Sequence, residues 1–190
     1  MGMKVILTGA TGYVGAYLVH ELVQQTDAEV ICLVRAATPR DGLERVRTNL
    51  RRYGLATPAT LARVSVVLGD LTEEHLGLGE TAFRALAARI DTIVHSAAWV
   101  NFVYPYQHLK KTNVDSTEIL LRLATAAAPK AIQFHFISTM GVVMSTGYDR
   151  STPILEESPL LHADEIEQDE QHQPETEALT EQMKAARDRF

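Results

Sequence analysis

Five short apolar runs alternate with longer stretches of helical periodicity through the first 137 residues. The apolar runs cover residues 4–8, 29–34, 63–68, 91–95 and 131–137. The helical patterns between them cover residues 13–26, 42–53, 80–89 and 105–127. Apolar runs without an alternating polar face are typical of parallel strands covered on both sides, and strand–helix–strand units close right-handed. The pattern predicts an α/β fold with a Rossmann-type doubly wound parallel sheet of five strands.

Apolar stripes predict the buried faces of two of these helices. In the first helix the stripe consists of Val14, Leu18, Leu22 and Val23. The last helix starts at Pro105, where the missing N–H of proline costs nothing. Its inward residues are predicted to be Leu109, Val114, Leu120, Leu121 and Ala124.

Charge divides the chain near residue 150. Residues 151–190 hold 11 acidic and 3 basic residues, a net charge of −8, whereas residues 1–150 have a net charge of +2. We therefore predict a folded domain over residues 1–145. Residues 146–190 are predicted to form an acidic connector or tail, partly disordered, with one short helix near its end.

The composition of the whole chain excludes several classes of protein. Its formal net charge of −6 is opposite to the basic footprint of nucleic-acid binders. The single cysteine, Cys32, excludes a disulfide framework and a multi-thiolate zinc site, and His162 and His172 lie at no usual metal-ligand spacing. No apolar run is long enough to cross a bilayer, and no signal peptide is evident. We expect a cytoplasmic protein with no metal, no nucleic-acid partner and no membrane span.

Three glycines follow the first apolar run directly and open the first helical pattern. The segment is Thr8-Gly9-Ala10-Thr11-Gly12-Tyr13-Val14-Gly15. Gly9 permits a tight turn, Gly12 lets the backbone approach a pyrophosphate, and Gly15 lets the helix pack closely against the sheet. The helix N-terminus offers free N–H groups and the positive end of its dipole. The segment predicts a dinucleotide phosphate site, with a ligand-free glycine turn as the alternative.

Further motifs follow in order along residues 3–145. They are Cys32-Leu33-Val34-Arg35, Gly69-Asp70-Leu71, His95-Ser96-Ala97-Ala98-Trp99-Val100-Asn101, Tyr104-Pro105-Tyr106, Thr112-Asn113-Val114 and Phe136-Ile137-Ser138-Thr139. Together with the glycine spacing, they resemble the extended branch of the short-chain dehydrogenase/reductases, and within it the thioester reductase group. That group comprises reductase domains of nonribosomal peptide synthetases, carboxylic acid reductases and fatty acyl reductases. The resemblance implies an NAD(P)-binding oxidoreductase.

Arg35 indicates which dinucleotide binds. An NAD site usually carries an acidic residue about 20 residues past the glycines to bind the ribose diol. Here the residue 20 positions past Gly15 is Arg35. A guanidinium can bind a 2′-phosphate through two hydrogen bonds, so we predict NADPH rather than NADH. A solvated arginine at a strand end is the alternative.

The resemblance implies the remaining cofactor contacts. Arg45 corresponds to a second arginine against the 2′-phosphate, while His95 is expected to be only a packed residue at a strand end. Further cofactor-binding residues are expected to be Asp70, Leu71, Ser96, Ala97, Ala98 and Asn113. From the glycine segment, they are Thr8, Gly9, Thr11, Gly12, Tyr13, Val14 and Gly15.

The resemblance also implies catalytic groups, of which the chain holds only some. In this superfamily a tyrosine with a lysine four residues later supplies the proton, and a Ser or Thr after the fifth strand hydrogen-bonds the substrate oxygen. Thr139, with Ser138 beside it, matches the second role. The only Tyr-x-x-x-Lys in the chain runs from Tyr106 to Lys110, before the fifth strand, and is expected to be unrelated to catalysis. Because the proton-donating pair is otherwise absent, little or no turnover is expected.

Three functions remain open at this point. The first is the NADP(H)-binding portion of a reductase of acyl thioesters on a carrier protein or CoA, giving aldehyde or alcohol. In that case the 190 residues are expected to be a piece that stops before the substrate-binding part. The second is a non-catalytic nucleotide-binding or regulatory module, favoured by the missing pair. The third is a nucleotide-sugar epimerase or dehydratase of the same superfamily, which Arg35 and the Trp99-Val100-Asn101 segment disfavour.

Overall fold

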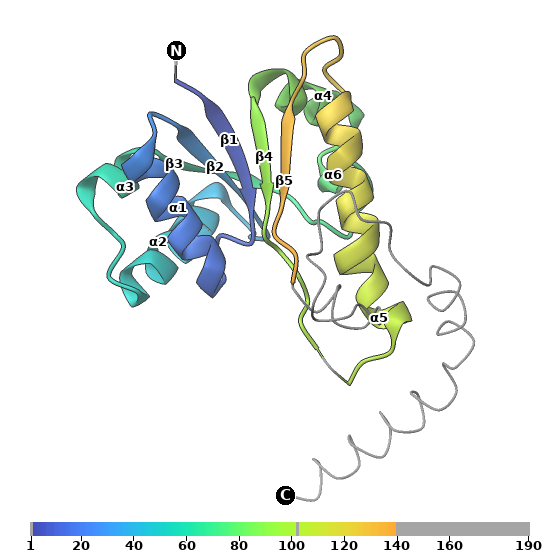
Figure 1. Cartoon of the computed structure of the whole chain (residues 1–190), viewed down its shortest axis with the longest axis horizontal. Coiled ribbons are helices and arrows are strands. Elements are labelled where there is room, and N and C mark those ends of the chain that lie inside the picture. The colour runs from blue at the N-terminus through green and yellow to red at the C-terminus, as the bar shows by residue number, and fades with distance from the viewer. Residues whose placement is uncertain (1, 102, 140–190) are drawn as a thin grey trace, which may run out of the picture. The chain divides into compact units, whose positions relative to one another are not determined.

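The computed structural model describes residues 2–101 and 103–139, and it contains the predicted parallel sheet (Figure 1). The strand order is β3-β2-β1-β4-β5, and all four pairings are parallel. The strands are β1 Lys4–Thr8, β2 Glu29–Val34, β3 Val64–Leu68, β4 Thr92–His95 and β5 Gln133–Phe136. This is the order of the first five strands in a doubly wound sheet, so the predicted fold class is confirmed.

The sheet lies in the first of two compact units. That unit comprises residues 1–99 and 111–137, whereas residues 100–110 and 138–190 form the second. The predicted boundary at residue 145 and the acidic segment 146–190 lie outside the described residues. Of the second unit, the structure describes α5, Tyr106–Lys110, and the short stretches beside it.

Helices cover both faces of the sheet. Figure 1 shows α1, α2 and α3 on one side of the strands and α4 and α6 on the other. Their bounds are α1 Tyr13–Gln25, α2 Pro39–Arg52, α3 Pro58–Ala62, α4 Glu80–Arg89 and α6 Ser116–Thr125. Two single turns complete the order, η1 Glu74–Gly77 and the π-helical η2 Lys111–Asp115.

Alternate residues of the strands feed two separate cores. Val5 and Leu7 of β1 pack in the cluster that contains residues of α1 and α2. Ile6, between them, packs in the cluster that contains residues of α4 and α6, together with Ile93 of β4. Both clusters are fully buried around β1, which explains why the central strands carry no polar alternation.

The start of α2 differs from the expected one by three residues. Thr38 and Pro39 form a helix start in which the Thr38 hydroxyl accepts the backbone N–H of Asp41 at 3.2 Å and proline occupies the first turn. Threonine satisfies a free N–H of the first turn, and proline has no N–H to satisfy there. This capping signal, rather than Gly42, sets the boundary.

The predicted apolar stripe of the first helix was wrong in part. The residues of α1 that are buried are Gly15, Ala16, Val19 and Val23, whereas Val14 is 47% exposed. Leu18 and Leu22 pack only at the border of the core. Small residues face the sheet at the start of α1 because the helix approaches the strands closely there, and a larger stripe would hold it away.

The last helical pattern is interrupted, so its predicted inward face was also wrong in part. Leu120 is buried as expected and so is Leu123, but Val114 and Leu121 are exposed. In the π turn η2 the backbone hydrogen bonds join residues five apart instead of four, and this breaks the 3.6-residue period. The face before it and the face after it therefore do not belong to one stripe.

β5 also differs from the prediction of a strand covered on both faces, since most of its residues are exposed.

Asp91 joins the N-terminal ends of β1 and β4 to the segment before β5. Its Oδ2 accepts the backbone N–H of Lys4 at 2.8 Å, and its Oδ1 lies 2.9 Å from Lys130 Nζ. The hydrogen bond from Lys130 and that from the Lys4 backbone hold the pKa of Asp91 below its ordinary value. This carboxylate therefore stabilises the folded state in its charged form.

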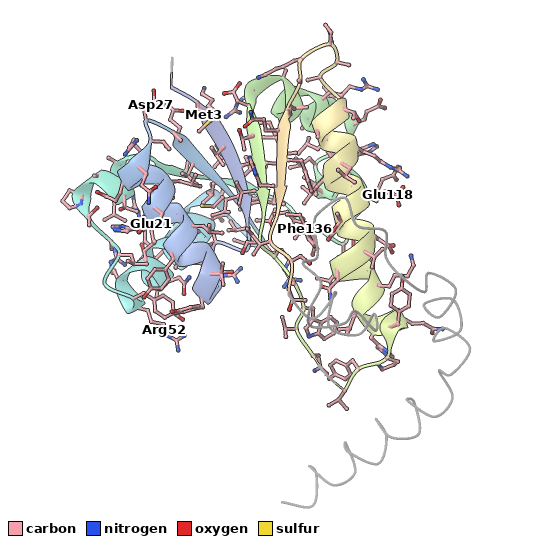
Figure 2. The ribbon with its side chains drawn as sticks, in the orientation of Figure 1. Met3, Glu21, Asp27, Arg52, Glu118 and Phe136 are labelled. Atoms are coloured by element: carbon pink, nitrogen blue, oxygen red, sulfur yellow. The ribbon has the colours of Figure 1, made fainter. Side chains whose placement is uncertain are left out.

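We expect acid to weaken the fold through Asp91. A folded-state pKa below the unfolded value of about 3.9 means that its contribution is present above that pH and is lost as pH falls through the folded pKa. Urea midpoints measured between pH 7 and pH 3 should fall less steeply in Asp91→Asn, which keeps an acceptor for Lys4. Asp27→Asn is the control, since Asp27 lies near Met3 at the same end of the sheet (Figure 2). Identical pH profiles for wild type and Asp91→Asn would contradict this expectation.

Candidate cofactor site

The glycine loop connects β1 to α1 in a conformation that requires glycine at two positions. Gly9 has φ of +79°, and a Cβ there would stand 2.9 Å from the backbone N of Ala97. A Cβ on Gly15 would stand 2.1 Å from the carbonyl oxygen of Gly9. L side chains rarely adopt the first conformation, and no Cβ fits the second contact. The tight turn predicted for Gly9 and the close packing predicted for Gly15 are confirmed.

The N-terminus of α1 opens to solvent at this loop. Gly12 is the N-cap and provides no side-chain acceptor, and the first turn contains no acidic residue. Tyr13 is 62% exposed, and Thr11 and Val14 beside it are exposed as well. The first-turn N–H groups and the positive end of the helix dipole are therefore accessible to an anion.

Thr8 joins this loop to the segment after β4. Its hydroxyl oxygen accepts the N–H groups of Ser96 and Ala97 at 3.2 and 3.1 Å and lies 2.7 Å from His95 Nδ1. The two N–H groups use both lone pairs of the hydroxyl, so Thr8 donates its proton to Nδ1 and His95 carries its own proton on Nε2. The Thr8 side chain is fully buried and holds the Ser96–Ala97 backbone in place.

His95 is a packed strand-end residue, as predicted. It is fully buried, and its ring lies 5.4 Å from the ring of Phe136, centroid to centroid. Burial lowers its pKa to about 4, so the imidazole is neutral at physiological pH. Its Nε2 has no hydrogen-bond partner within the described part of the chain.

Arg35 and Arg45 come together at the carboxyl end of β2. A guanidinium N–H of Arg45 donates to the backbone carbonyl of Arg35. The Arg35 side chain is 73% exposed, and its Nη1 lies 3.8 Å from Asp70 Oδ2. The pair thus presents two guanidinium groups at the sheet edge where doubly wound folds bind ligands.

Asp70 is held firmly at the same edge, after β3. Its Oδ1 accepts the backbone N–H of Thr72 at 2.9 Å and the Thr72 hydroxyl at 2.8 Å. Burial by itself would raise the pKa of Asp70, but these hydrogen bonds and the charges of Arg35 and Lys111 hold it below its ordinary value. Asp70 is therefore ionised and forms an exposed ion pair with Arg35.

A left-handed turn at His75 and Leu76 supports the backbone at Asp70. His75 and Leu76 have φ of 51° and 60°, values that cost about 1–2 kcal/mol for residues other than glycine. Leu76 is fully buried, and its carbonyl accepts the N–H of Asp70 at 2.9 Å. Burial of the leucine side chain offsets the strain, and the turn sets the backbone beside Leu71, which is half-buried. No pattern in the sequence predicts this turn.

A hollow of about 500 Å³ opens between the glycine loop and α2. Its lining includes Thr11 of the loop, Arg45, Asn49 and Arg52 of α2, and the carboxylates of Asp41 and Glu44. Figure 2 labels Arg52 at the end of α2, and its guanidinium carbon lies 5.7 Å from the centroid of the Tyr53 ring. Sequence reasoning missed Asn49 and Arg52, because a helical period alone does not show which face of α2 meets the loop.

Asn113 holds the other end of the segment after β4. Its Oδ1 accepts the backbone N–H of Trp99 at 2.7 Å, and its Nδ2 donates to the Trp99 carbonyl at 3.0 Å. Asn113 lies in the π turn η2, which brings its side chain to this position. Between the two ends, Ser96 and Ala97 are half-buried and Ala98 is exposed.

The candidate catalytic residues belong to the second unit. Ser138 and Thr139 follow β5 and are exposed. Tyr106 and Lys110 are the first and last residues of α5, whereas Tyr148 lies outside the described residues.

Among the described residues, no group of three or more His, Cys, Asp or Glu side chains could hold a metal ion. Within residues 2–101 and 103–139, no helix is long and apolar enough to cross a membrane.

Comparison with known proteins agrees with this arrangement. The family model described as "Male sterility protein", an NAD-binding family, matches residues 7–187. The chain belongs to this family. A linear gramicidin synthase polypeptide of Brevibacillus parabrevis is 47% identical to it over 152 residues, which are 80% of this chain and 3% of the synthase polypeptide.

Solved structures place this family member among the reductase domains. The terminal reductase domain from the myxalamid biosynthetic pathway superposes with a TM-score of 0.74 at 42% identity, covering 84% of this chain and 39% of that domain. A thiolation-reductase di-domain from an archaeal nonribosomal peptide synthetase superposes with a TM-score of 0.64 at 26% identity, covering 83% of this chain and 32% of that structure. The chain is therefore an NAD(P)-binding Rossmann domain of the thioester reductase type, and it spans well under half of these relatives.

Proposed function

We propose that this chain binds NADPH and forms the cofactor-binding part of a reductase acting on acyl thioesters carried by a protein or by CoA. The observation that carries the proposal is the pair Arg35 and Arg45 beside the glycine loop. An NAD site carries a carboxylate where Arg35 stands, and a carboxylate repels a 2′-phosphate. The Arg45 guanidinium donates to the backbone carbonyl of Arg35, so two arginines lie close together and would offer that phosphate several charge-assisted hydrogen bonds.

The other residues of the site fit the remaining parts of the same cofactor. The first-turn N–H groups of α1, with the exposed loop residues Thr11, Tyr13 and Val14, suit the pyrophosphate. Asp70 and Leu71 would border the adenine, and Ser96, Ala97 and Ala98 would line the ribose and nicotinamide. Thr8 and Asn113 contribute indirectly, by holding the ends of that last segment. NADPH supplies the hydride for a carbonyl, whereas the chain's own residues bind and orient it.

The substrate side of the proposal rests on the relatives. A solved relative joins a thiolation domain to a reductase domain, which supports a carrier-bound thioester as the partner. The hydroxyls of Thr139 and Ser138 would hydrogen-bond the substrate oxygen. A cytoplasmic location agrees with this chemistry and with the single buried thiol of Cys32, whose pKa burial raises to about 12.

A second function is favoured by one observation, the lack of a Tyr-x-x-x-Lys pair after the fifth strand. Tyr148 is the last tyrosine of the sequence, and Thr152 stands four residues later. Without this pair, the 190 residues can bind a dinucleotide but lack the tyrosine–lysine arrangement that would protonate the reduced oxygen. These residues would then act as a nucleotide-binding module that is not catalytic by itself.

Titration with the two dinucleotides tests the proposal. NADPH fluorescence should report binding to the 190-residue chain at least about tenfold tighter than that of NADH, a difference of about 1.4 kcal/mol. Equal affinities, or tighter binding of NADH, would overturn the assignment of the cofactor. Consumption of NADPH with an acyl-CoA or acyl-carrier thioester should remain near background, and robust turnover would show that another group supplies the proton.

A further inference from the structure

Asn49 is a polar residue at a core position of α2. The buried face of this helix consists of Gly42, Val46, Asn49 and Leu50, and the helical period alone would place an apolar residue at position 49. A buried amide is costly unless its N–H groups are hydrogen-bonded. Asn49 Nδ2 meets this requirement by donating to the carbonyls of Ala10 at 3.0 Å and Gly12 at 2.8 Å. Both partners can only accept, so the orientation of the amide is determined.

The two carbonyls belong to the glycine loop, and holding them determines where the loop's N–H groups point. Both peptide bonds are trans, since the only cis bond in the described residues is Ala128–Pro129. In a trans peptide the C=O and the following N–H point in opposite directions. With the carbonyls of Ala10 and Gly12 turned toward Asn49, the N–H groups of Thr11 and Tyr13 are turned away from it, toward the exposed side of the loop.

The peptide between these two is oriented by the loop itself. The N–H of Gly12 donates to the carbonyl of Gly9 at 2.8 Å. The carbonyl of Gly12 also accepts the N–H of Ala16 at 3.2 Å, at the start of α1. Asn49 therefore orients the Ala10–Thr11 peptide and reinforces the orientation of the Gly12–Tyr13 peptide. Two N–H groups directed to one side next to a helix N-terminus form a concave anion site.

We propose that Asn49 is a positioning residue that aims the Thr11 and Tyr13 N–H groups at a bound pyrophosphate. This inference rests on the proposed function and deepens it, because it assigns a task to a residue of α2 whose amide N–H groups are both used by carbonyls of the glycine loop. It also gives α2 two tasks on one helix. Arg45 binds the 2′-phosphate directly, and Asn49, one turn later, holds the loop for the pyrophosphate.

The roles of Arg45 and Asn49 can be separated, because different ligands contain the 2′-phosphate and the pyrophosphate. Both NADPH and NADH contain the pyrophosphate, so loss of the Asn49 amide weakens the two dinucleotides by the same factor. Adenosine 2′-monophosphate contains no pyrophosphate, so its binding depends on the arginines and the adenine contacts and not on the N–H groups of the glycine loop. A variant that merely loosens the domain would weaken all three ligands together.

The experiment compares wild type with Asn49→Asp and Asn49→Leu, two changes that keep the number of side-chain heavy atoms and remove the donor. Gln24→Leu, which removes an exposed amide from α1, is the matched control. Both Asn49 variants should bind NADPH and NADH about tenfold more weakly. Their affinity for adenosine 2′-monophosphate should equal that of wild type. Loss for NADPH alone, loss for all three ligands, or loss only in the charged Asn49→Asp would overturn the proposal.

Inorganic pyrophosphate separates this inference from the proposed function. In ¹⁵N spectra of the wild-type chain, pyrophosphate should shift the amide resonances of Thr11 and Tyr13, and both Asn49 variants should need about tenfold more of it. If wild type responds to pyrophosphate but binds neither dinucleotide, the proposed function fails and the assignment of Asn49 stands. No shift in wild type, or equal titrations for wild type and both variants, would overturn the assignment of Asn49.

Discussion

Replacing Arg35 and Arg45 together by alanine is expected to weaken NADPH binding by more than about 100-fold while leaving NADH binding within about twofold of wild type. In the proposed site each guanidinium would make charge-assisted hydrogen bonds to the 2′-phosphate, and such bonds contribute about 1.5–3 kcal/mol apiece. NADH has a hydroxyl at that position and loses little. Fluorescence titration of both dinucleotides against the double variant measures the change in preference.

The single variants show how the two arginines divide the work. Arg45→Ala removes one guanidinium and also its hydrogen bond to the Arg35 carbonyl, so it should cost at least as much as Arg35→Ala. Arg40→Ala is the control for a general loss of positive charge, because Arg40 is an exposed residue of the same helix. An equal loss of NADPH affinity in Arg40→Ala would show that net charge, and not the 2′-phosphate contact, is being measured.

Replacing Gly15 by alanine is expected to destabilise the domain by about 1–3 kcal/mol and to abolish measurable dinucleotide binding. The added Cβ would meet the Gly9 carbonyl at 2.1 Å, so either α1 or the glycine loop must move. Helix propensity by itself predicts the opposite sign, since alanine is favoured over glycine in a helix interior by about 1 kcal/mol. Urea unfolding and NADPH titration of the same variant separate the two effects.

Gly54→Ala provides the matched comparison for Gly15→Ala. A Cβ at Gly54 has open space around it, but the residue has φ of +70°. This change should therefore cost only the backbone strain, about 1 kcal/mol, and leave NADPH binding unchanged. If the Gly15→Ala variant is at least as stable as wild type and binds NADPH normally, then α1 can shift without cost, and the expectation is wrong.

Local sequence patterns were sufficient for the sheet. β1 and β2 begin and end at the predicted residues, and β3 and β4 differ by one residue at one end. A buried parallel strand is an unbroken apolar run bounded by turn residues, so its limits are visible locally. The helices were less certain at their ends and faces. α2 begins at a capping threonine and proline, and η2 breaks a period that the sequence otherwise continues.

Only part of the candidate site was also predictable from local sequence. The glycine loop and Arg35 were predicted because each depends on a short spacing along the chain. Asn49 was not, since its two hydrogen bonds join residues 39 and 37 positions apart. Thr8 and Asn113 were predicted as cofactor contacts, but the structure shows that their side chains bind backbone groups of the segment after β4. Only the folded chain shows which polar atoms are already used.

The sequence by itself determined the order of strands and helices, the position of the glycine loop and the charge at the end of β2. These follow from hydrophobic period, glycine spacing and residue type, all of which act over a few neighbouring residues. The tertiary structure decided which residues hold that loop open, where Arg45 meets Arg35 and how the left-handed turn supports Asp70. Those contacts join separate segments, and they form only when burial of the two cores brings α2, η1 and η2 to the edge of the sheet.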